Sequence, residues 1–295
     1  MSRLNSIVTR TTLIVIFVVV FSSCSRGAAP DVLTTTTILE DVTRNIAGDR
    51  LTVQSLLPVG VDPHSYQPVP QDAAMVSESK VFVVHGAEYE VFMQALLDNA
   101  GGKENVIEAS TGLRLLSDEQ GTDPHLWLDP NNVIAYSDNI REGLSQFDPD
   151  GAEVYETNAS IYIDQLAELD SWINGQVAQI EPERRVLVTN HEALGYFADR
   201  YGFRIVGAVI PSFSSDSAPS AQQMAELIEQ IKIQQVPAIF LDASDNPDLA
   251  QQIAAETGVK VVTDLHLESL TEGGPAATYM DLMKDNVTKI VQALQ

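Results

Sequence analysis

The sequence predicts an α/β protein with two lobes, each built on a mainly parallel four-stranded sheet, joined by one long rigid helix. The first observation is that short β-rich runs alternate with helical stretches, which is typical of parallel sheets with helices on both faces. This alternation occurs over residues 31–147 and again over residues 183–295. The second observation is an uninterrupted helical periodicity over residues 148–182, between the two halves.

The composition limits the classes of function. The 295 residues include 17 Lys and Arg against 41 Asp and Glu, giving a formal net charge of −24, and 44% of them are hydrophobic, as in ordinary folded proteins. A surface this acidic repels phosphate backbones, which excludes nucleic acid as a partner. The single cysteine excludes an internal disulfide and a CxxC zinc or redox motif.

The first 23 residues have the features of a signal peptide. Arg3 and Arg10 precede the apolar run Leu13–Phe21, which is shorter than the ~20 residues that span a bilayer. Small residues then lead to Cys24, as in a bacterial lipoprotein signal. We expect residues 24–30 to be an anchor or tether, with a lipid on Cys24 as the membrane attachment. The alternative is a plain secretory signal that removes Cys24; both predict an exported protein, lipid-anchored at the outer face of the membrane or periplasmic.

The first lobe is expected to contain four strands and four helices. The strands are predicted at the short β-rich runs Val32–Ile38, Leu51–Leu57, Lys80–Val84 and Asn105–Glu108. The helices are predicted at the intervening stretches Leu39–Ala47, Gln71–Ser77, Tyr89–Asn99 and Asn131–Phe147.

A long helix is expected to link the lobes. Apolar residues recur there every three or four positions: Tyr155, Ala159, Tyr162, Leu166, Leu169, Ile173, Val177 and Ile180. Pro149 marks its start and Pro182 its end, because proline disfavours helix at the residue before it. About 30 residues form a rod of roughly 45 Å. A long helix packed inside a single domain is the alternative.

The second lobe repeats the alternation. Its strands are predicted at Arg185–Thr189, Arg204–Val209, Ala238–Asp242 and Val259–Thr263. Its helices are predicted at Glu192–Tyr201, Ser220–Gln234, Asp248–Thr257 and Thr278–Leu294.

Three of the five histidines lie in loops that start with Pro or Asn near predicted strand ends. His64 and His125 each follow an Asp-Pro pair, and His191 lies at the end of a strand, where ligands of open α/β sheets bind. Imidazole binds zinc and other first-row metals, and its second nitrogen needs an acceptor, for which Asp62 and Asp123 are candidates. One such histidine is typical of a surface turn. Three in rigid, distant loops predict a metal site assembled between the lobes.

Four ordered segments resemble the metal-binding solute-binding proteins of bacterial zinc and manganese ABC importers, and the likeness covers nearly the whole mature chain: Leu57–Tyr66, Asp123–Pro130, Thr189–Phe197 and Tyr279–Asn286. The resemblance implies two lobes joined by a rigid helix, with one metal ion in the cleft. It implies ligands at His64, His125 and His191, and a carboxylate on a loop before the last helix.

The fourth ligand implied by the resemblance is Glu268, where the family usually has Asp. Asp264 and His266 lie in the same stretch and are the alternatives. His85 stands where the family commonly has Asn, so we expect it to be structural. Trp127 and Tyr196 are expected to pack in the cleft wall and the core.

Three imidazoles and one carboxylate suit tetrahedral Zn²⁺, so we expect zinc as the transported ion, with Mn²⁺ as the alternative. The implied partner is the permease of an ABC importer, served by a monomeric binding protein that is not an enzyme. A secreted zinc hydrolase with Glu192 as its base is an alternative of another class, but the chain has no H-E-x-x-H motif. A metal-containing adhesin that acts in cell adhesion is a third.

Overall fold

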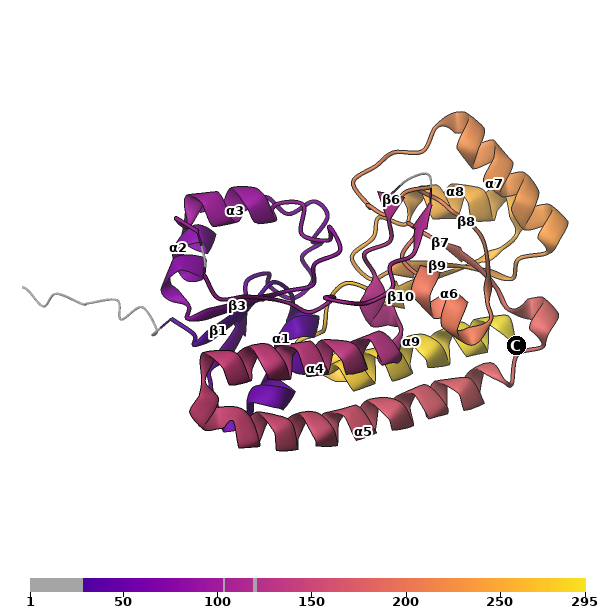
Figure 1. Cartoon of the computed structure of the whole chain (residues 1–295). Coiled ribbons are helices and arrows are strands. Elements are labelled where there is room, and N and C mark those ends of the chain that lie inside the picture. The colour runs from indigo at the N-terminus through magenta and orange to yellow at the C-terminus, as the bar shows by residue number, and fades with distance from the viewer. Residues whose placement is uncertain (1–28, 103, 119–120) are drawn as a thin grey trace, which may run out of the picture.

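Two α/β lobes lie side by side on a base of helices (Figure 1). The computed structural model describes residues 29–102, 104–118 and 121–295, so the predicted signal peptide and Cys24 lie outside the described residues. The base consists of α4 (Pro130–Phe147), α5 (Ala152–Val177) and α9 (Tyr279–Leu294). None of the described helices is long and apolar enough to cross a bilayer.

The first lobe contains a parallel sheet of four strands in the order β2-β1-β3-β4. The strands are β1 (Val32–Thr34), β2 (Val53–Ser55), β3 (Val81–Val84) and β4 (Val106–Glu108). The helices between them are α1 (Thr37–Ala47), α2 (Pro70–Glu78) and α3 (Met93–Asn99). Alternate strand residues point to opposite faces, so Leu33 and Phe82 pack with α2 and α3, whereas Val32 and Val81 join the core that contains α1.

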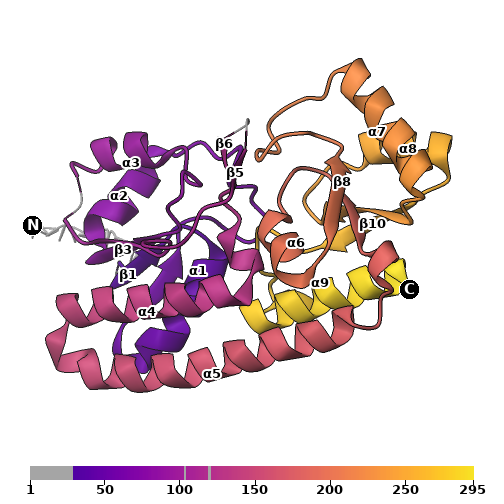
Figure 2. The ribbon, with the colours of Figure 1, turned by 45° about the vertical axis from the view of Figure 1, so that its right-hand side comes forward.

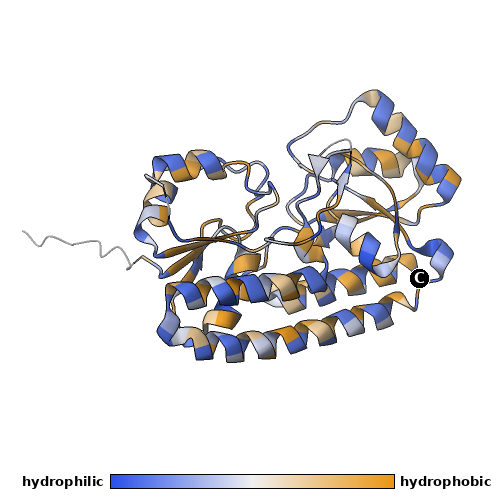
Figure 3. Ribbon diagram, in the orientation of Figure 1, coloured by the Kyte–Doolittle hydropathy of each residue, from blue (hydrophilic) through white to orange (hydrophobic). Residues whose placement is uncertain are grey.

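The second lobe contains another parallel sheet, in the order β10-β9-β7-β8. Its strands are β7 (Val186–Thr189), β8 (Arg204–Ala208), β9 (Ala238–Asp242) and β10 (Lys260–Leu265). Its helices are α6 (Gly195–Tyr201), α7 (Ala221–Gln234) and α8 (Asp248–Thr257), followed by α9. The buried strands of both sheets are the most continuously hydrophobic parts of the ribbon (Figure 3).

The connection between the first sheet and the base includes a small antiparallel pair, β5 (Ser117–Asp118) and β6 (Gly121–Thr122). A short 3-10 turn, Leu126–Leu128, then leads into α4. Asp129 caps α4 by accepting a 2.9 Å hydrogen bond from the Asn131 N–H, and Pro130 occupies the first turn, where its missing N–H costs nothing.

The long helix α5 has 26 residues, about 39 Å at the usual rise. Its buried stripe is the predicted one, from Tyr155 to Val177. Near its start, Asp148 accepts hydrogen bonds from Arg50 (2.8 Å) and Tyr155 (2.6 Å). Further along, Asp170 accepts two from Arg200 (3.0 and 2.6 Å). The helix is thus fastened to the first lobe at one end and to the second lobe at the other.

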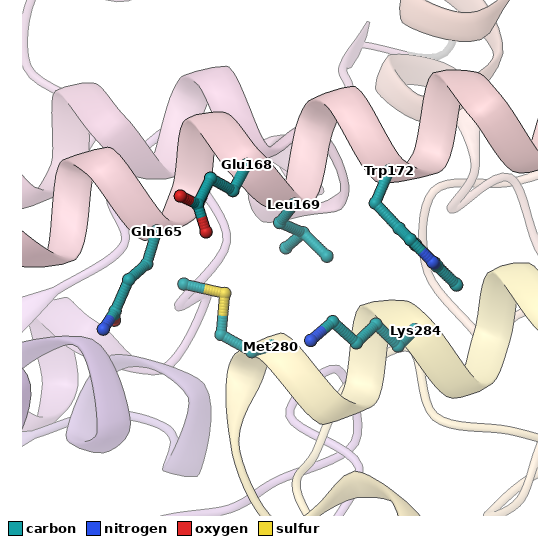
Figure 4. A pocket seen from close by; sticks show the side chains of 6 residues that line it. All are labelled: Gln165, Glu168, Leu169, Trp172, Met280 and Lys284. Carbon is teal, nitrogen blue, oxygen red and sulfur yellow. The ribbon is translucent and has the colours of Figure 1, made fainter.

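Helices α5 and α9 run side by side along the base (Figures 1 and 2). A shallow pocket of about 340 Å³ lies on the outer side of this seam. Its lining side chains extend toward one another from the two helices (Figure 4): Gln165, Glu168, Leu169, Trp172, Met280 and Lys284. The pocket contains no histidine, and its lining is separate from the histidine cluster described below.

One hydrophobic cluster runs through both lobes. It includes Val32 and Val81 of the first sheet, Leu166 of α5, Leu187 of the second sheet and Leu282 of α9, all at most 1% exposed. The two lobes therefore share a core as well as a connecting helix, and each lobe has a smaller cluster of its own on its outer face.

The predicted fold class is confirmed, but several element bounds differ from those expected; the long helix, for example, ends at Val177 and not near Pro182. The first strand ends at Thr34 because Thr36 instead caps α1, accepting from the Leu39 N–H. Helix α3 begins at Met93, after a turn of residues with positive φ over 86–88. The predicted helix Glu192–Tyr201 begins only at Gly195.

Candidate metal centre

Four buried side chains from four separate loops meet between the lobes. His64 follows β2, and His125 precedes the 3-10 turn at the start of α4. His191 follows β7, and Glu268 follows β10. All four are at most 9% exposed. The structure thus brings together the four residues that the sequence and its resemblance nominated.

The donor atoms of this cluster lie at short and similar separations. His125 Nε2 is 3.3 Å from His64 Nε2 and 3.4 Å from His191 Nε2. Glu268 Oε1 is 3.2 Å from the Nε2 atoms of His125 and His191, and 3.7 Å from that of His64. Four donors around a zinc ion at about 2.0–2.1 Å lie roughly 3.3 Å apart in a tetrahedron. The donor set therefore fits one small divalent ion.

The two Asp-Pro-His segments form the same local turn. The Asp62 carboxylate accepts from the His64 backbone N–H at 2.9 Å, and Asp123 accepts from the His125 backbone N–H at 3.0 Å. Asp123 also bonds the His125 ring, with Oδ1 2.8 Å from Nδ1, as expected of an outer acceptor. Asp62 instead accepts from Ser215 of the second lobe at 2.6 Å. Only Asp123 therefore has the predicted contact with an imidazole ring.

His191 is presented by the end of a buried strand. The Thr189 hydroxyl donates to the His191 carbonyl at 2.6 Å, and the N–H of Asn190 donates to the Phe240 carbonyl of β9 at 3.1 Å. The Glu192 N–H donates to the Ser212 carbonyl at 2.8 Å. These bonds fix the turn on both sides of His191, so its ring enters the cleft from a rigid support.

Of the three candidates for the fourth position, the structure brings Glu268 to the histidines. The side chains of Asp264 and His266 turn toward α9, where Asp264 pairs with Lys289 at 3.0 Å. Asn286 accepts from the His266 N–H at 2.8 Å and donates to its carbonyl at 2.6 Å. This clamp explains the Asn at the end of the Tyr279–Asn286 motif, because it orients the loop that carries Glu268.

Aromatic residues form the wall behind the cluster. The Trp127 ring is fully buried and donates from Nε1 to the Leu267 carbonyl at 2.8 Å, and the Tyr279 hydroxyl donates to the Trp127 carbonyl at 2.6 Å. Tyr196 donates to the Asp123 carbonyl at 3.0 Å. Trp127 and Tyr196 therefore pack as expected; in addition, Trp127 holds the loop that carries Glu268, and Tyr196 holds the loop that carries His125.

His85 lies behind the site rather than in it. It is fully buried, with Nε2 2.8 Å from the Thr36 hydroxyl oxygen and its ring stacked edgewise against Tyr89. Burial lowers the pKa of His85 to about 3, so the ring is neutral at physiological pH. This is the structural role that the sequence predicted.

Tyr89 is the site residue that sequence reasoning missed. It is 1% exposed, and its hydroxyl donates to Glu268 Oε2 at 2.6 Å. Burial and the neighbouring Glu268 carboxylate raise the pKa of Tyr89 well above its ordinary value, so it remains a donor. Its partner is 179 positions away along the chain, and no local pattern indicates so distant a pair.

The charges of the site are coupled. Burial by itself disfavours the charged form of His125, but the Glu268 carboxylate and the hydrogen bond to Asp123 outweigh it and raise the pKa of His125 to about 9. Burial likewise opposes ionisation of Glu268, but the charge on His125 and the hydrogen bonds from the histidines hold its pKa well below the ordinary value. Without a metal, an imidazolium and a carboxylate neutralise each other.

Comparisons with known proteins agree on one family. Residues 32–293 match the family described as zinc-uptake complex component A, periplasmic. The manganese-binding lipoprotein MntA of Halalkalibacterium halodurans is 37% identical, over 91% of this chain and 89% of its own. The manganese ABC transporter substrate-binding lipoprotein PsaA of Streptococcus pneumoniae is 30% identical, over 96% and 98%.

Solved structures share the whole two-lobed fold. The Mn-bound periplasmic metal-binding protein of Candidatus Liberibacter asiaticus superposes with a TM-score of 0.81 at 30% identity, over 90% of this chain and 99% of that one. The periplasmic zinc-binding protein TroA of Treponema pallidum gives 0.83 at 28% identity, over the same shares. These relatives are binding proteins and not enzymes. The chain therefore belongs to the family of metal-binding solute-binding proteins of bacterial ABC importers.

Proposed function

We propose that this chain binds one zinc ion through His64, His125, His191 and Glu268 and delivers it to the membrane permease of an ABC importer. The observation that carries the proposal is the convergence of three imidazole nitrogens and one carboxylate oxygen, all buried and all within 4.8 Å of one another, with His125 Nε2 and Glu268 Oε1 3.2–3.7 Å from the other donors. Such a set holds a divalent ion without requiring large movements of the loops.

The choice of zinc rests on the donor chemistry. Three neutral imidazoles and one oxygen suit four-coordinate zinc, whereas manganese prefers more oxygen ligands and a higher coordination number. Relatives of both kinds exist, since MntA and PsaA are named for manganese and TroA for zinc. Manganese is therefore the alternative cargo, and the experiments below discriminate between the two.

The organisation that we propose for the chain follows its family. Residues 1–23 direct export, residues 24–30 form a tether with a lipid on Cys24, residues 31–147 and 183–295 are the lobes, and residues 148–182 link them. MntA and PsaA are named as lipoproteins, which supports the anchor. A monomer tethered outside the cytoplasmic membrane can collect an ion and reach the permease in the same membrane.

Equilibrium dialysis of the purified chain tests the ligand set. We expect one zinc ion per chain, bound reversibly and without hydrolysis of peptide or ester substrates. His191→Ala should weaken binding by more than the roughly 10- to 100-fold typical of outer partners. His266→Ala is the matched control, because this half-buried histidine lies outside the cluster and should leave binding unchanged. Equal losses of zinc affinity in the two variants would contradict the assignment of His191 as a ligand.

A second experiment tests which ion is transported. Most protein sites bind zinc more tightly than manganese, so a higher affinity for zinc does not by itself identify the transported ion. The gene for the chain is deleted in its own organism, and the total zinc and manganese contents of the cells are measured. The ion whose content falls is the one that the chain delivers. We expect zinc to fall while manganese is unchanged, with rescue by the intact chain and none by the His191→Ala variant. A fall in manganese alone would assign the chain to manganese.

A further inference from the structure

We propose that Tyr89 is a specificity-determining residue: by holding Glu268 Oε2, it limits Glu268 to one metal-bonding oxygen and so favours four-coordinate zinc over manganese. The inference rests on the proposed function and deepens it, since it concerns which cargo this site prefers.

The two oxygens of Glu268 have different partners. Oε1 faces the histidines, 3.2 Å from His125 Nε2 and 3.2 Å from His191 Nε2. Oε2 accepts the Tyr89 hydroxyl at 2.6 Å, a short bond typical of a charged acceptor. Glu268 is 4% exposed, so water has little access to replace Tyr89. Because Tyr89 holds Oε2, only Oε1 of this carboxylate is available to bind a metal ion.

Tyr89 is itself held rigidly against the site. Its ring meets that of His64 edge-on, with centroids 5.3 Å apart, and packs against Trp127 at 4.7 Å and His85 at 4.9 Å. A buried ring packed against aromatic neighbours in this way has little freedom to rotate, so its hydroxyl stays on Oε2.

A strained turn delivers Tyr89 to this position. Ala87 and Glu88 have φ of 52° and 63°, in the left-handed region that residues other than glycine rarely adopt. The buried Glu90 carboxylate stabilises the turn, accepting from the backbone N–H groups of His85 (2.7 Å) and Gly86 (3.1 Å). Consecutive strained residues persist only where the surroundings enforce them, and they cluster at functional sites.

The consequence for metal choice follows from coordination number. With Oε2 held, the described residues supply four donors, which completes a zinc site. Manganese binds best with additional oxygen ligands, and the second oxygen of Glu268 is the nearest source. Removing the Tyr89 hydroxyl frees Oε2, so the carboxylate can bind a metal with both oxygens. The affinity for manganese then rises relative to the affinity for zinc.

The test compares Tyr89→Phe with Tyr136→Phe and the intact chain. Tyr136 is an equally buried tyrosine whose hydroxyl has no hydrogen-bond partner among the described residues, so its variant loses the same atom away from Glu268. Competition titrations give the ratio of zinc to manganese affinity. We expect this ratio to fall by about tenfold or more in Tyr89→Phe, as for loss of a hydrogen bond to a charged group, and to be unchanged in Tyr136→Phe. Identical ratios in both variants overturn the inference.

Cobalt substitution gives a second readout, the coordination number of the bound ion, that does not depend on affinity once folded protein is saturated with Co²⁺. Four-coordinate Co²⁺ absorbs visible light strongly, and five- or six-coordinate Co²⁺ absorbs weakly. We expect a strong spectrum for the intact chain and Tyr136→Phe, and a weaker one for Tyr89→Phe. A weak spectrum for the intact chain contradicts the inference even if the proposed function is right. If the intact chain binds no ion at all, the proposed function itself fails.

Discussion

At the scale of single residues, Asp62 and Asp123 show how one tripeptide serves two purposes. Both fix a histidine main chain through the same turn, but only Asp123 reaches an imidazole ring, while Asp62 reaches Ser215 in the other lobe. A carboxylate on the far nitrogen of a ligand orients the ring and raises its basicity.

Replacing Asp123 should therefore weaken metal binding more than replacing Asp62. We expect Asp123→Asn to lower zinc affinity by about 10- to 100-fold, the usual effect of an outer partner of a ligand, and Asp62→Asn to have a smaller effect. A competition titration with a chelator measures both variants. Equal losses would show that the carboxylates act through the turns alone.

The raised pKa of His125 predicts a proton on this ring in the metal-free chain at pH 7, since the pKa is about 9. Zinc must displace it, so binding should release about one proton and affinity should rise with pH until about pH 9. The same proton stabilises the metal-free fold fully below the ordinary pKa of ~6.5, and this contribution is lost as pH rises through about 9.

Titration calorimetry in buffers of different ionisation enthalpy measures the released proton at pH 7. The heat of zinc binding should change with the buffer in proportion to one proton. A heat that is the same in every buffer would mean that His125 is already neutral before the metal arrives.

The sequence predicts some of these residues and misses others for physical reasons. His64, His125 and His191 are recognisable because each follows a turn residue or a strand end that can be read locally. Residues alone do not separate Glu268 from Asp264 and His266; the separation comes from where β10 ends and from the Asn286 clamp on the far helix. The role of Tyr89 cannot be predicted from the sequence, because it depends on a contact with Glu268, far away along the chain.

At the scale of elements, two loops close over the site from opposite lobes. Residues 58–64 of the first lobe are held across the cleft by Ser215, which donates to Asp62 at 2.6 Å, and by Ser269, which accepts from the Gly60 N–H at 2.9 Å. Ser269 directly follows Glu268, and Asp62 lies two positions before His64. Both of these hydrogen bonds therefore lie beside a residue of the cluster.

Removing one of these bonds should accelerate metal release. We expect Ser215→Ala to raise the dissociation rate of zinc by roughly threefold to tenfold, the value of one hydrogen bond, because the loop with His64 opens more often. Ser217→Ala is the control, since Ser217 bonds Ser212 of its own loop. Stopped-flow release into a chelator measures both rates, and unchanged release from Ser215→Ala would contradict the role of this bond.

Element bounds were predicted well where propensity and tertiary structure agree. The strand Ala238–Asp242 and the helix Asp248–Thr257 match the expected ranges. Thr35 to Thr37 are β-branched and typical of a strand, but capping of α1 by Thr36 has the stronger effect. The helix expected at Tyr89 begins at Met93 because Glu90 stabilises a turn that precedes it.

At the scale of the whole molecule, the two lobes are one mechanical unit. The shared core extends from the first sheet through α5 and α9 to the second sheet, and α5 is fastened near both ends by Asp148 and Asp170. Large hinge movements would expose this core, so we expect the cleft to open by local movement of its loops. We expect the acidic surface to attract divalent cations toward the site in general, and the four buried donors to provide the selectivity among them.

The most direct test of the central claim is a crystal structure of the zinc-loaded chain with anomalous diffraction measured on both sides of the zinc edge. We predict one anomalous peak in the cleft, about 2.0–2.1 Å from Nε2 of His64, His125 and His191 and from one oxygen of Glu268. A peak at another place, or one that lacks His191 or Glu268 as a neighbour, would contradict the account.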